Sequence, residues 1–181
     1  MTTSPPSSSS RPLEGVRVLD LSRVLAGPFC TMILAQLGAQ VIKVERPGAG
    51  DDSRAFGPFV NGKSLYFSSI NYDKESIALD LKQPADRAIF EDLLGVCDIV
   101  VENFRPGTME KLGYGWDTLH AKYPNLIYGA ASGFGYGNLA SAESACLALG
   151  NGNPLTPLTA IWWPDLRTNQ TNTTLAIKVR F

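Results

Sequence analysis

The stretch LDLSRVLAGPFCTMILAQLGAQVIKVERPG, residues 19–48, decides the fold of this chain. It begins inside GVRVLDLS (15–22), a short Val- and Leu-rich run typical of a buried parallel strand. A turn at AGP follows, with Pro28 predicted at the first helical position, where its missing N–H costs nothing. The helix should run to about Leu37, with Gly38 as its C-terminal cap. AQVIKVE then predicts a second strand, which completes a right-handed βαβ unit.

The same alternation continues along the chain. Residues 47–65 are rich in Gly, Pro and Asp and predict a loop, and a strand follows at about 76–81. QPADRAIFEDLLGVC predicts a helix with Pro84 at its start, and DIVVE predicts another buried strand. Two short helices, in NFRPGTMEKLG and WDTLHAKYP, precede a strand at NLIYGAAS and a loop at GFGYG. This order indicates an α/β fold with a Rossmann-like parallel sheet and flanking helices.

Composition excludes several classes of function. The 181 residues suffice for one domain, and 44% hydrophobic with 18% charged residues is typical of a globular chain. A net charge of −1 gives no electrostatic reason to expect nucleic acid or an anionic membrane as a partner. Residues 1–11 predict a disordered tail without the apolar run of a signal peptide. The cytoplasm is therefore the expected compartment.

The cysteines and the single histidine do not point to catalysis. Cys30, Cys97 and Cys146 are widely spaced in apolar contexts, so buried reduced thiols are expected. His120 lies in DTLHAKYP, where a surface or packing role is the better interpretation. No metal ligand set is predicted.

Four polar loops follow the predicted strands: SRVLAGP, ERPGAGDD, ENFRPG and SGFG. Ligands of open α/β sheets bind at this edge. The G-x-G-x-x-G of a dinucleotide site is missing, and Pro28 removes one N–H, so NAD or FAD in the usual mode is not expected. Arg46, after the second strand, could accept a ribose phosphate of NADP or of coenzyme A. An ordinary surface charge is the alternative.

Four segments carry a resemblance over residues 12–136: LEGVRVLDLSRVLAGPFCTMILAQLGAQVIKVERPGAGDDSR, NYDKESIALDLK, CDIVVENFRPGTMEKLGYGWDTL and LIYGAASGFG. In this order they closely resemble the N-terminal portion of the family III CoA-transferases, the CaiB/BaiF family that includes formyl-CoA transferase. The resemblance implies that residues 12–137 form a CoA-binding α/β domain. It implies coenzyme A as acyl carrier without a metal, and acyl-CoA and small carboxylic acids as partners, with neither nucleic acid nor membrane.

The resemblance also implies a set of CoA-contacting residues, carried over by motif. Arg105 and Lys111 are cations suited to phosphates, and Leu25, Leu79 and Phe104 could flank a flat adenine. Core packing is the alternative for each leucine. The full set is Val24, Leu25, Ala26, Arg46, Leu79, Asn103, Phe104, Arg105, Lys111 and Leu112.

The family's transfer chemistry uses an Asp that attacks the acyl-CoA thioester to form a mixed anhydride. The resemblance places this Asp shortly after SGFG, in a GPxxxRPGYD-like segment, but this chain continues YGNLASAESACLALGNGNP. Glu143 is the nearest carboxylate, and Asp165, in WWPDLR, is the only Asp after residue 136. No catalytic residue is therefore assigned, and the chain is expected to be inactive.

Residues 138–181 differ in character from the rest. They carry few charges and many Asn and Thr, which an altered reading frame, splice junction or gene end could produce; a genuine divergent tail is the alternative. Within them, SAESACLALG could form a helix and LAIKVRF an edge strand. The family's second domain and returning segment are missing, so we expect a truncated fold. Ordinary or disordered association is then expected instead of the family's interlocked homodimer.

Two other functions stay open. An α-methylacyl-CoA racemase-like fragment would share this N-terminal architecture, but it needs a His and an Asp flanking the α-carbon. His120 precedes the last strand, so that pair is not visible. A non-catalytic CoA-binding module would share residues 12–136 and lack turnover.

Overall fold

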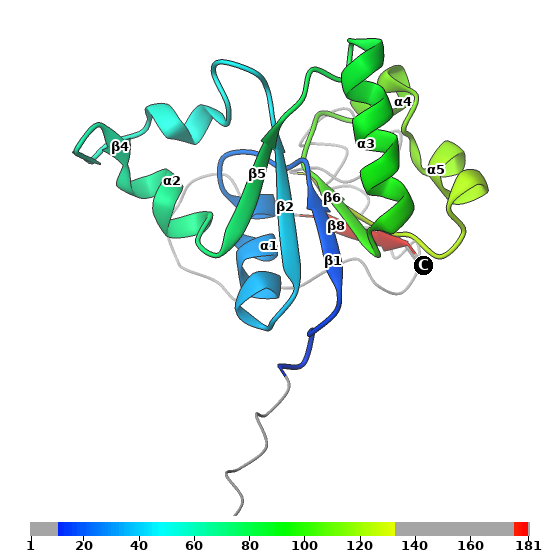
Figure 1. The fold of residues 1–181 in the computed structure, drawn as a ribbon, viewed down its shortest axis with the longest axis horizontal. Coiled ribbons are helices and arrows are strands. Elements are labelled where there is room, and N and C mark those ends of the chain that lie inside the picture. Colours follow the sequence, from blue (N-terminus) through cyan, green and yellow to red (C-terminus); the bar gives the residue numbers. More distant parts are fainter. Residues whose placement is uncertain (1–10, 133–175, 181) are drawn as a thin grey trace, which may run out of the picture.

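The computed structural model describes residues 11–132 and the strand 176–180. One six-stranded sheet organises the chain, in the order β5-β2-β1-β6-β7-β8 (Figure 1). Neighbours from β5 to β7 pair in parallel, and β8 pairs antiparallel with β7. The strands are β1 (Arg17–Asp20), β2 (Gln40–Glu45), β5 (Lys74–Ala78), β6 (Ile99–Glu102), β7 (Ile127–Ser132) and β8 (Ala176–Arg180). The predicted parallel α/β sheet is confirmed, and residues 176–180 of the LAIKVRF segment form an edge strand.

The strand order reverses at β1. Its last residue, Asp20, lies opposite Lys43 of β2 on one side and Val101 of β6 on the other. The chain runs outward from β1 through β2 to β5, and then crosses back to β6. Such a reversal separates the loops that leave the two neighbouring strands, and it opens a crevice at their carboxyl ends.

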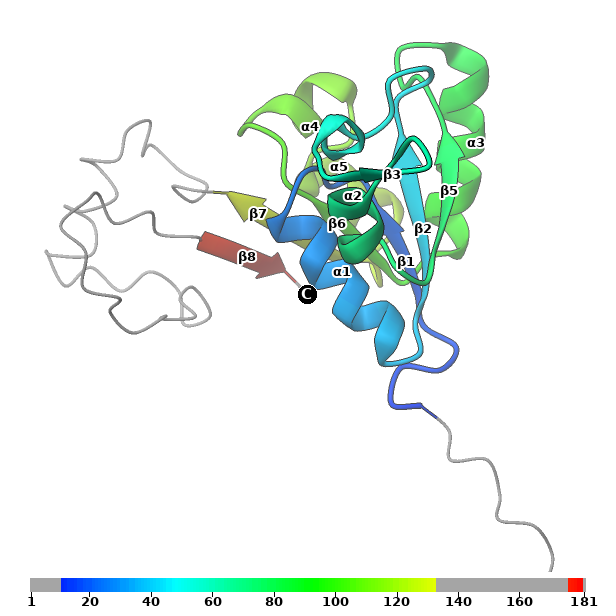
Figure 2. The ribbon, with the colours of Figure 1, turned by 90° about the vertical axis from the view of Figure 1, so that its left-hand side faces the viewer.

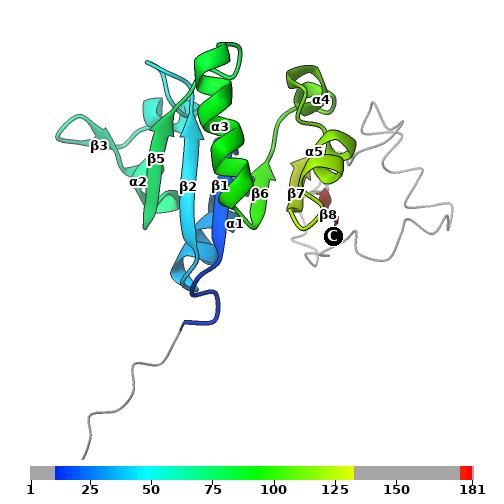
Figure 3. The ribbon, with the colours of Figure 1, turned by 45° about the vertical axis from the view of Figure 1, so that its right-hand side comes forward.

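Helices cover both faces of the sheet. In Figure 2, α1 and α3 lie on opposite sides of the central strands, and Figure 3 shows α4 and α5 beside β6 and β7. The helices are α1 (Ala26–Gln36), α2 (Leu65–Ile70), α3 (Pro84–Val96), α4 (Thr108–Leu112) and α5 (Trp116–Lys122), with a 3₁₀ turn η1 (Asp52–Ala55).

The central strands have apolar side chains on both faces, which explains their unbroken hydrophobic runs. Leu19 and Val100 belong to the core under α3, α4 and α5, together with Phe90. Val18 and Val101 belong to the smaller core under α1. Adjacent residues therefore enter opposite cores, as the two-residue period of a strand requires.

The start and end of α1 differ in how well they were predicted. The helix begins at Ala26, so Pro28 occupies the third helical position and not the first. Proline is still tolerated there because the N–H groups of the first turn have no partner within the helix. Gly38 follows the C-cap Leu37 with φ 109°, as predicted for the end of the helix.

The segment after β2 contains more structure than predicted. The expected loop 47–65 holds η1 and a small hairpin of β3 (Phe59–Val60) and β4 (Lys63–Ser64). The following strand β5 ends before the predicted 76–81 region does, although the Leu79 N–H still donates to the Glu45 carbonyl at 2.9 Å.

Among the described residues, Cys30, Cys97 and His120 occupy packing positions. Cys97 is buried and Cys30 half-buried, both as free thiols, and burial raises the pKa of each. The ring of His120 stacks on Trp116 of the same helix, at 4.6 Å between centroids. Cys146, residues 1–10 and the predicted helix SAESACLALG lie outside the described residues. In the part of the chain that the structure describes, no helix is long and apolar enough to cross a membrane.

Candidate functional site

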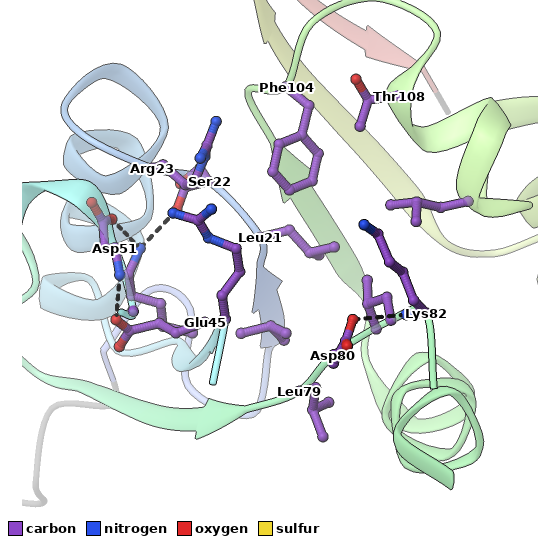
Figure 4. A pocket seen from close by; sticks show the side chains of 16 residues that line it. Leu21, Ser22, Arg23, Glu45, Asp51, Leu79, Asp80, Lys82, Phe104 and Thr108 are labelled. Atoms are coloured by element: carbon purple, nitrogen blue, oxygen red, sulfur yellow. Dashed lines mark hydrogen bonds and ion pairs between the residues drawn. The ribbon is translucent and has the colours of Figure 1, made fainter. Parts of the chain in front are cut away.

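A cavity of about 240 Å³ opens at the carboxyl ends of β1, β2, β5 and β6 (Figure 4). It lies where the strand order reverses, the position at which open α/β sheets bind ligands. The lining residues are Leu21, Ser22, Arg23, Lys43, Val44, Glu45, Arg46, Gly50, Asp51, Leu79, Asp80, Leu81, Lys82, Phe104, Thr108 and Leu112.

One part of the lining is apolar. Phe104 follows β6, and Leu79 and Leu81 follow β5, while Leu112 comes from α4. Leu79 is buried and belongs to the core at the same time, so core packing and cavity lining are both correct descriptions of it. Apolar and aromatic side chains with few polar groups are typical of sites for small ligands.

Cations stand at the edge of this apolar surface. Arg23 follows β1, Arg46 follows β2 and Lys82 follows β5. The Arg23 guanidinium lies over the Phe104 ring, 5.6 Å from its centroid. In Figure 4, Phe104 and Lys82 lie across the cavity from Glu45 and Asp51. Such a set of cations beside an apolar wall can bind an anion attached to a flat ring system.

A buried ion pair forms the base of the cavity. Lys43 Nζ lies 2.9 Å from Asp51 Oδ2, and it also donates to the Ser22 carbonyl at 2.7 Å. Asp51 accepts further hydrogen bonds from the N–H and hydroxyl of Ser53. Burial alone would raise the pKa of Asp51, but the Lys43 ammonium and Ser53 lower it. Asp51 is therefore a charged structural group below the ligand space.

The loop after β1 is held in an unusual backbone conformation. Val24 has φ 67°, a left-handed conformation that is costly for a β-branched residue. The Val24 N–H points to the Asp51 carboxylate at 3.2 Å. The side-chain amide of Asn103 accepts from the Arg23 N–H and donates to the Arg23 carbonyl, both at 2.7 Å. The loop is thus fixed before any ligand arrives.

The AGP turn allows α1 to pack closely against the loop that precedes it. A Cβ atom on Gly27 would lie 2.2 Å from the Cβ of Ser22, so glycine is needed for the close approach of α1 to the preceding loop. Below this contact, Asp20 accepts from Thr31 at 2.6 Å and from Lys74 at 3.1 Å. Lys74 also donates to the Pro28 carbonyl at 2.8 Å. The turn is therefore tied to β1 and β5 and presents no glycine-rich phosphate loop.

The end of β2 is held by a second cluster. The Glu45 carboxylate accepts from Arg54 at 2.6 and 2.7 Å and from Ser76 at 2.6 Å, and the Asp51 N–H donates to it at 2.9 Å. Burial alone would raise the pKa of Glu45. These hydrogen bonds and the Arg54 charge outweigh burial and lower the pKa from 4.5 to about 2. Glu45 fixes the loop that carries Arg46.

The residues proposed from the resemblance fall into three groups. Four of them line the cavity: Arg46, Leu79, Phe104 and Leu112. Val24 and Asn103 instead hold the shape of the first loop. The remaining four lie outside the lining, and most of them are exposed: Leu25, Ala26, Arg105 and Lys111. As CoA contacts, all of these residues stay a proposal.

Sequence reasoning missed other parts of the site. Arg23 stands in the SRVLAGP loop directly after a predicted strand, and its charge and position could have identified it. Lys82 follows β5 in the same way. Lys43 could not be found so easily, because a lysine within a strand is ordinarily an exposed residue.

The architecture is that of an α/β domain with a cavity at its topological switch point. The model of CoA-transferase family III matches residues 13–150. The chain is 47% identical over 163 residues to succinyl-CoA:glutarate CoA-transferase from Mus musculus, covering 82% of this chain and 37% of that protein. It is 50% identical over 135 residues to acetyl-CoA:oxalate CoA-transferase from Acetobacter aceti, covering 75% and 35%.

Solved structures agree with this relationship. A CaiB/BaiF family protein from Brucella suis superposes with a TM-score of 0.62 at 41% identity, covering 66% of this chain and 33% of that one. The protein Rv3272 from Mycobacterium tuberculosis gives a TM-score of 0.61 at 43% identity, covering 67% and 33%. The chain belongs to CoA-transferase family III. It spans about a third of the length of these relatives.

Proposed function

We propose that this chain is the N-terminal CoA-binding portion of a protein that transfers CoA between an acyl-CoA and a carboxylic acid. The observation that carries the proposal is the cavity at the strand reversal, with an apolar surface around Phe104 and cations at its edge. Coenzyme A has the matching chemistry, because its flat adenine is attached to a ribose phosphate and a pyrophosphate.

The size of the cavity limits which part of the ligand enters. At about 240 Å³ it lies below the roughly 300–1,000 Å³ typical of sites for drug-sized ligands. Only the adenine end of CoA fits beside Phe104 and Leu79. The ribose phosphate then reaches Arg46 and Arg23 at the edge, where charge-assisted hydrogen bonds to guanidinium groups are strong. The pantetheine arm then extends out of the cavity.

The names of the relatives support the substrate class. They pair a CoA thioester of a small acid with an acceptor such as glutarate or oxalate. For the whole protein to which this chain belongs, we therefore propose acyl-CoA as donor and a small carboxylic acid as acceptor.

The described residues include the groups proposed to bind CoA, but no nucleophile is assigned among them. Among them, three carboxylates line the cavity, Glu45, Asp51 and Asp80, and each accepts hydrogen bonds from neighbouring groups. Asp165 and Glu143 lie outside the described residues. We expect the isolated chain to show no CoA exchange when it is incubated with acyl-CoAs and free acids and analysed by mass spectrometry. Exchange that disappears in Asp165→Ala would contradict this.

Calorimetric titration with CoA tests the binding proposal. Arg46→Ala should lose about 1.5–3 kcal/mol of binding free energy, a roughly 10- to 150-fold weaker affinity, because one charge-assisted phosphate contact is removed. Lys63→Ala is the matched control, since it removes one positive charge from the exposed hairpin and should bind as wild type does. Equal affinities of wild type and Arg46→Ala would overturn the proposed position of the phosphate. Absence of CoA binding by the wild-type chain would overturn the function.

A further inference from the structure

One carboxylate holds both arginines at the edge of the cavity. Asp52 Oδ1 lies 2.9 Å from Arg46 NH2, and Asp52 Oδ2 lies 3.1 Å from Arg23 NH1. The two arginines come from the ends of neighbouring strands, and Asp52 begins the 3₁₀ turn η1 that follows β2. Asp52 therefore bridges the two cations with one oxygen for each.

The bridge leaves part of the arginine pair unused. Within the residues that the structure describes, Arg23 Nε is buried and has no hydrogen-bond partner. A buried donor without a partner is costly, so this N–H calls for an acceptor that the described residues do not provide. The same guanidinium lies over Phe104, at the entrance to the apolar part of the cavity.

The bridge is also easy to displace. The exposed fractions of the side chains are 38% for Arg23, 58% for Arg46 and 44% for Asp52. Ion pairs exposed to this degree contribute little stability, because water and salt screen them. The neighbouring Asp51 differs, since it is buried against Lys43 and cannot leave.

We propose that Asp52 is an internal anion that occupies the arginine pair until a phosphomonoester of the ligand replaces it, and that it thereby selects for dianionic phosphate. This inference deepens the proposed function and rests on it for the identity of the ligand. The structural basis is one bridging carboxylate, two half-exposed arginines and one unpartnered Nε–H.

Charge balance explains the selectivity. Arg23 and Arg46 carry two positive charges, and Asp52 neutralises one of them. A phosphodiester with a single negative charge would only exchange one monoanion for another. A phosphomonoester carries close to two negative charges and three acceptor oxygens, so it can bind both forks and the Nε–H of Arg23. Each phosphorus of the CoA pyrophosphate carries one negative charge, so only the phosphomonoester, with close to two charges on one phosphorus, gains by displacing Asp52.

The test compares CoA with 3′-dephospho-CoA, which keeps the pyrophosphate and lacks the ribose phosphomonoester. Calorimetry is carried out on wild type and on Asp52→Asn and Asp52→Ala. Both variants should bind CoA roughly three- to tenfold tighter than wild type, since two weak ion pairs no longer compete. Their affinity for dephospho-CoA should stay within about twofold of the wild-type value. Asp92→Asn is the control, because it removes the same charge from the exposed surface of α3.

Inorganic phosphate, followed by the shift in Tm, separates this inference from the proposed function. Inorganic phosphate could stabilise Asp52→Asn more than wild type while neither protein binds CoA. That result would support the displacement of Asp52 by phosphate and would contradict the proposed CoA-binding function. Wild type could bind CoA while both Asp52 variants bind it equally well or more weakly. That result would contradict the displacement of Asp52 and would leave the proposed CoA-binding function intact. Equal tightening of CoA and dephospho-CoA would show that the ribose phosphomonoester is not the group that replaces Asp52, and it would overturn the inference.

Discussion

Two sets of ion pairs at the same edge of the sheet have the same lengths and opposite surroundings. The inner pairs, Lys43–Asp51 and Lys74–Asp20, measure 2.9 and 3.1 Å, and their side chains are at most 1% exposed. The rim pairs, Arg46–Asp52 and Arg23–Asp52, also measure 2.9 and 3.1 Å, with 38–58% of each side chain exposed. Distance therefore does not distinguish the two sets, and burial does.

The difference separates stability from binding. A buried charge that loses its partner remains in a low dielectric without compensation, so the inner pairs hold the loops in place. An exposed pair loses little when it opens, because water replaces the partner. Of the inner set, Lys43–Asp51 builds the base of the cavity and Lys74–Asp20 holds the start of α1, while the rim set stays available to a ligand.

Breaking an inner pair should have the largest effect. Lys43→Met leaves Asp51 buried and unpaired, and the free energy of unfolding should fall by about 3–5 kcal/mol. Urea unfolding followed by circular dichroism measures this. The double variant Lys43→Met/Asp51→Asn should recover part of the loss, since it removes the uncompensated charge. A single variant within about 1 kcal/mol of wild type would refute the structural role of this pair.

The second-largest loss of stability is expected at the contact between α1 and the loop that precedes it. Gly27→Ala forces a Cβ into Ser22, and overpacking of this kind costs about 1–3 kcal/mol of unfolding free energy. Gly95→Ala is the matched control: it lies in α3, where an added Cβ would meet only open space, and should be neutral or slightly stabilising. If both alanine variants unfold at the same urea concentration, the tight approach at Gly27 is not important.

The Glu45 cluster predicts a pH dependence. Its folded pKa of about 2 lies below its ordinary value of 4.5, so the carboxylate stabilises the fold fully above pH 4.5. That contribution should decline as the pH falls from 4.5 toward 2, because the unfolded chain binds the proton first. Urea midpoints between pH 5 and pH 3 should decrease less steeply in Glu45→Gln than in wild type. Parallel curves would contradict the assignment.

Breaking a rim pair should have the smallest effect on stability. Arg46→Met should leave the free energy of unfolding within about 1 kcal/mol of wild type, although the affinity for CoA falls. The same urea experiment measures the stability. A loss as large as that of Lys43→Met would show that the rim pairs are structural, and the comparison of the two sets would fail.

The fold was predictable because buried parallel strands need continuous apolar runs. VRVLDL and DIVVE show such runs, and they form the central strands β1 and β6. The hairpin of β3 and β4 was missed because each strand has only two residues, too few for a periodic pattern. The Asn61-Gly62 turn, with φ 50° and 73°, was the available signal.

The site was predictable only in part. Arg46 was predicted from its position after the second strand, and Leu79 and Phe104 through the family resemblance; all three line the cavity. The pairing of Asp52 with Arg23 could not be read from the sequence, because it depends on the loops of two different strands meeting in space. Whether a charged residue is buried also follows from packing, so the inner and rim pairs look alike before folding.

The double hydrogen bond between Asn103 and the Arg23 backbone has a consequence for the order in which the molecule assembles. These residues are 80 positions apart, and β6 must dock against β1 before Asn103 can reach the loop. On the ribosome, the first loop of the chain would therefore be made early and locked late. Up to that moment Asp51 can hold the Val24 N–H, but the Arg23 backbone lacks both of its hydrogen bonds to Asn103, so the nascent chain has no finished site to which a ligand could bind prematurely.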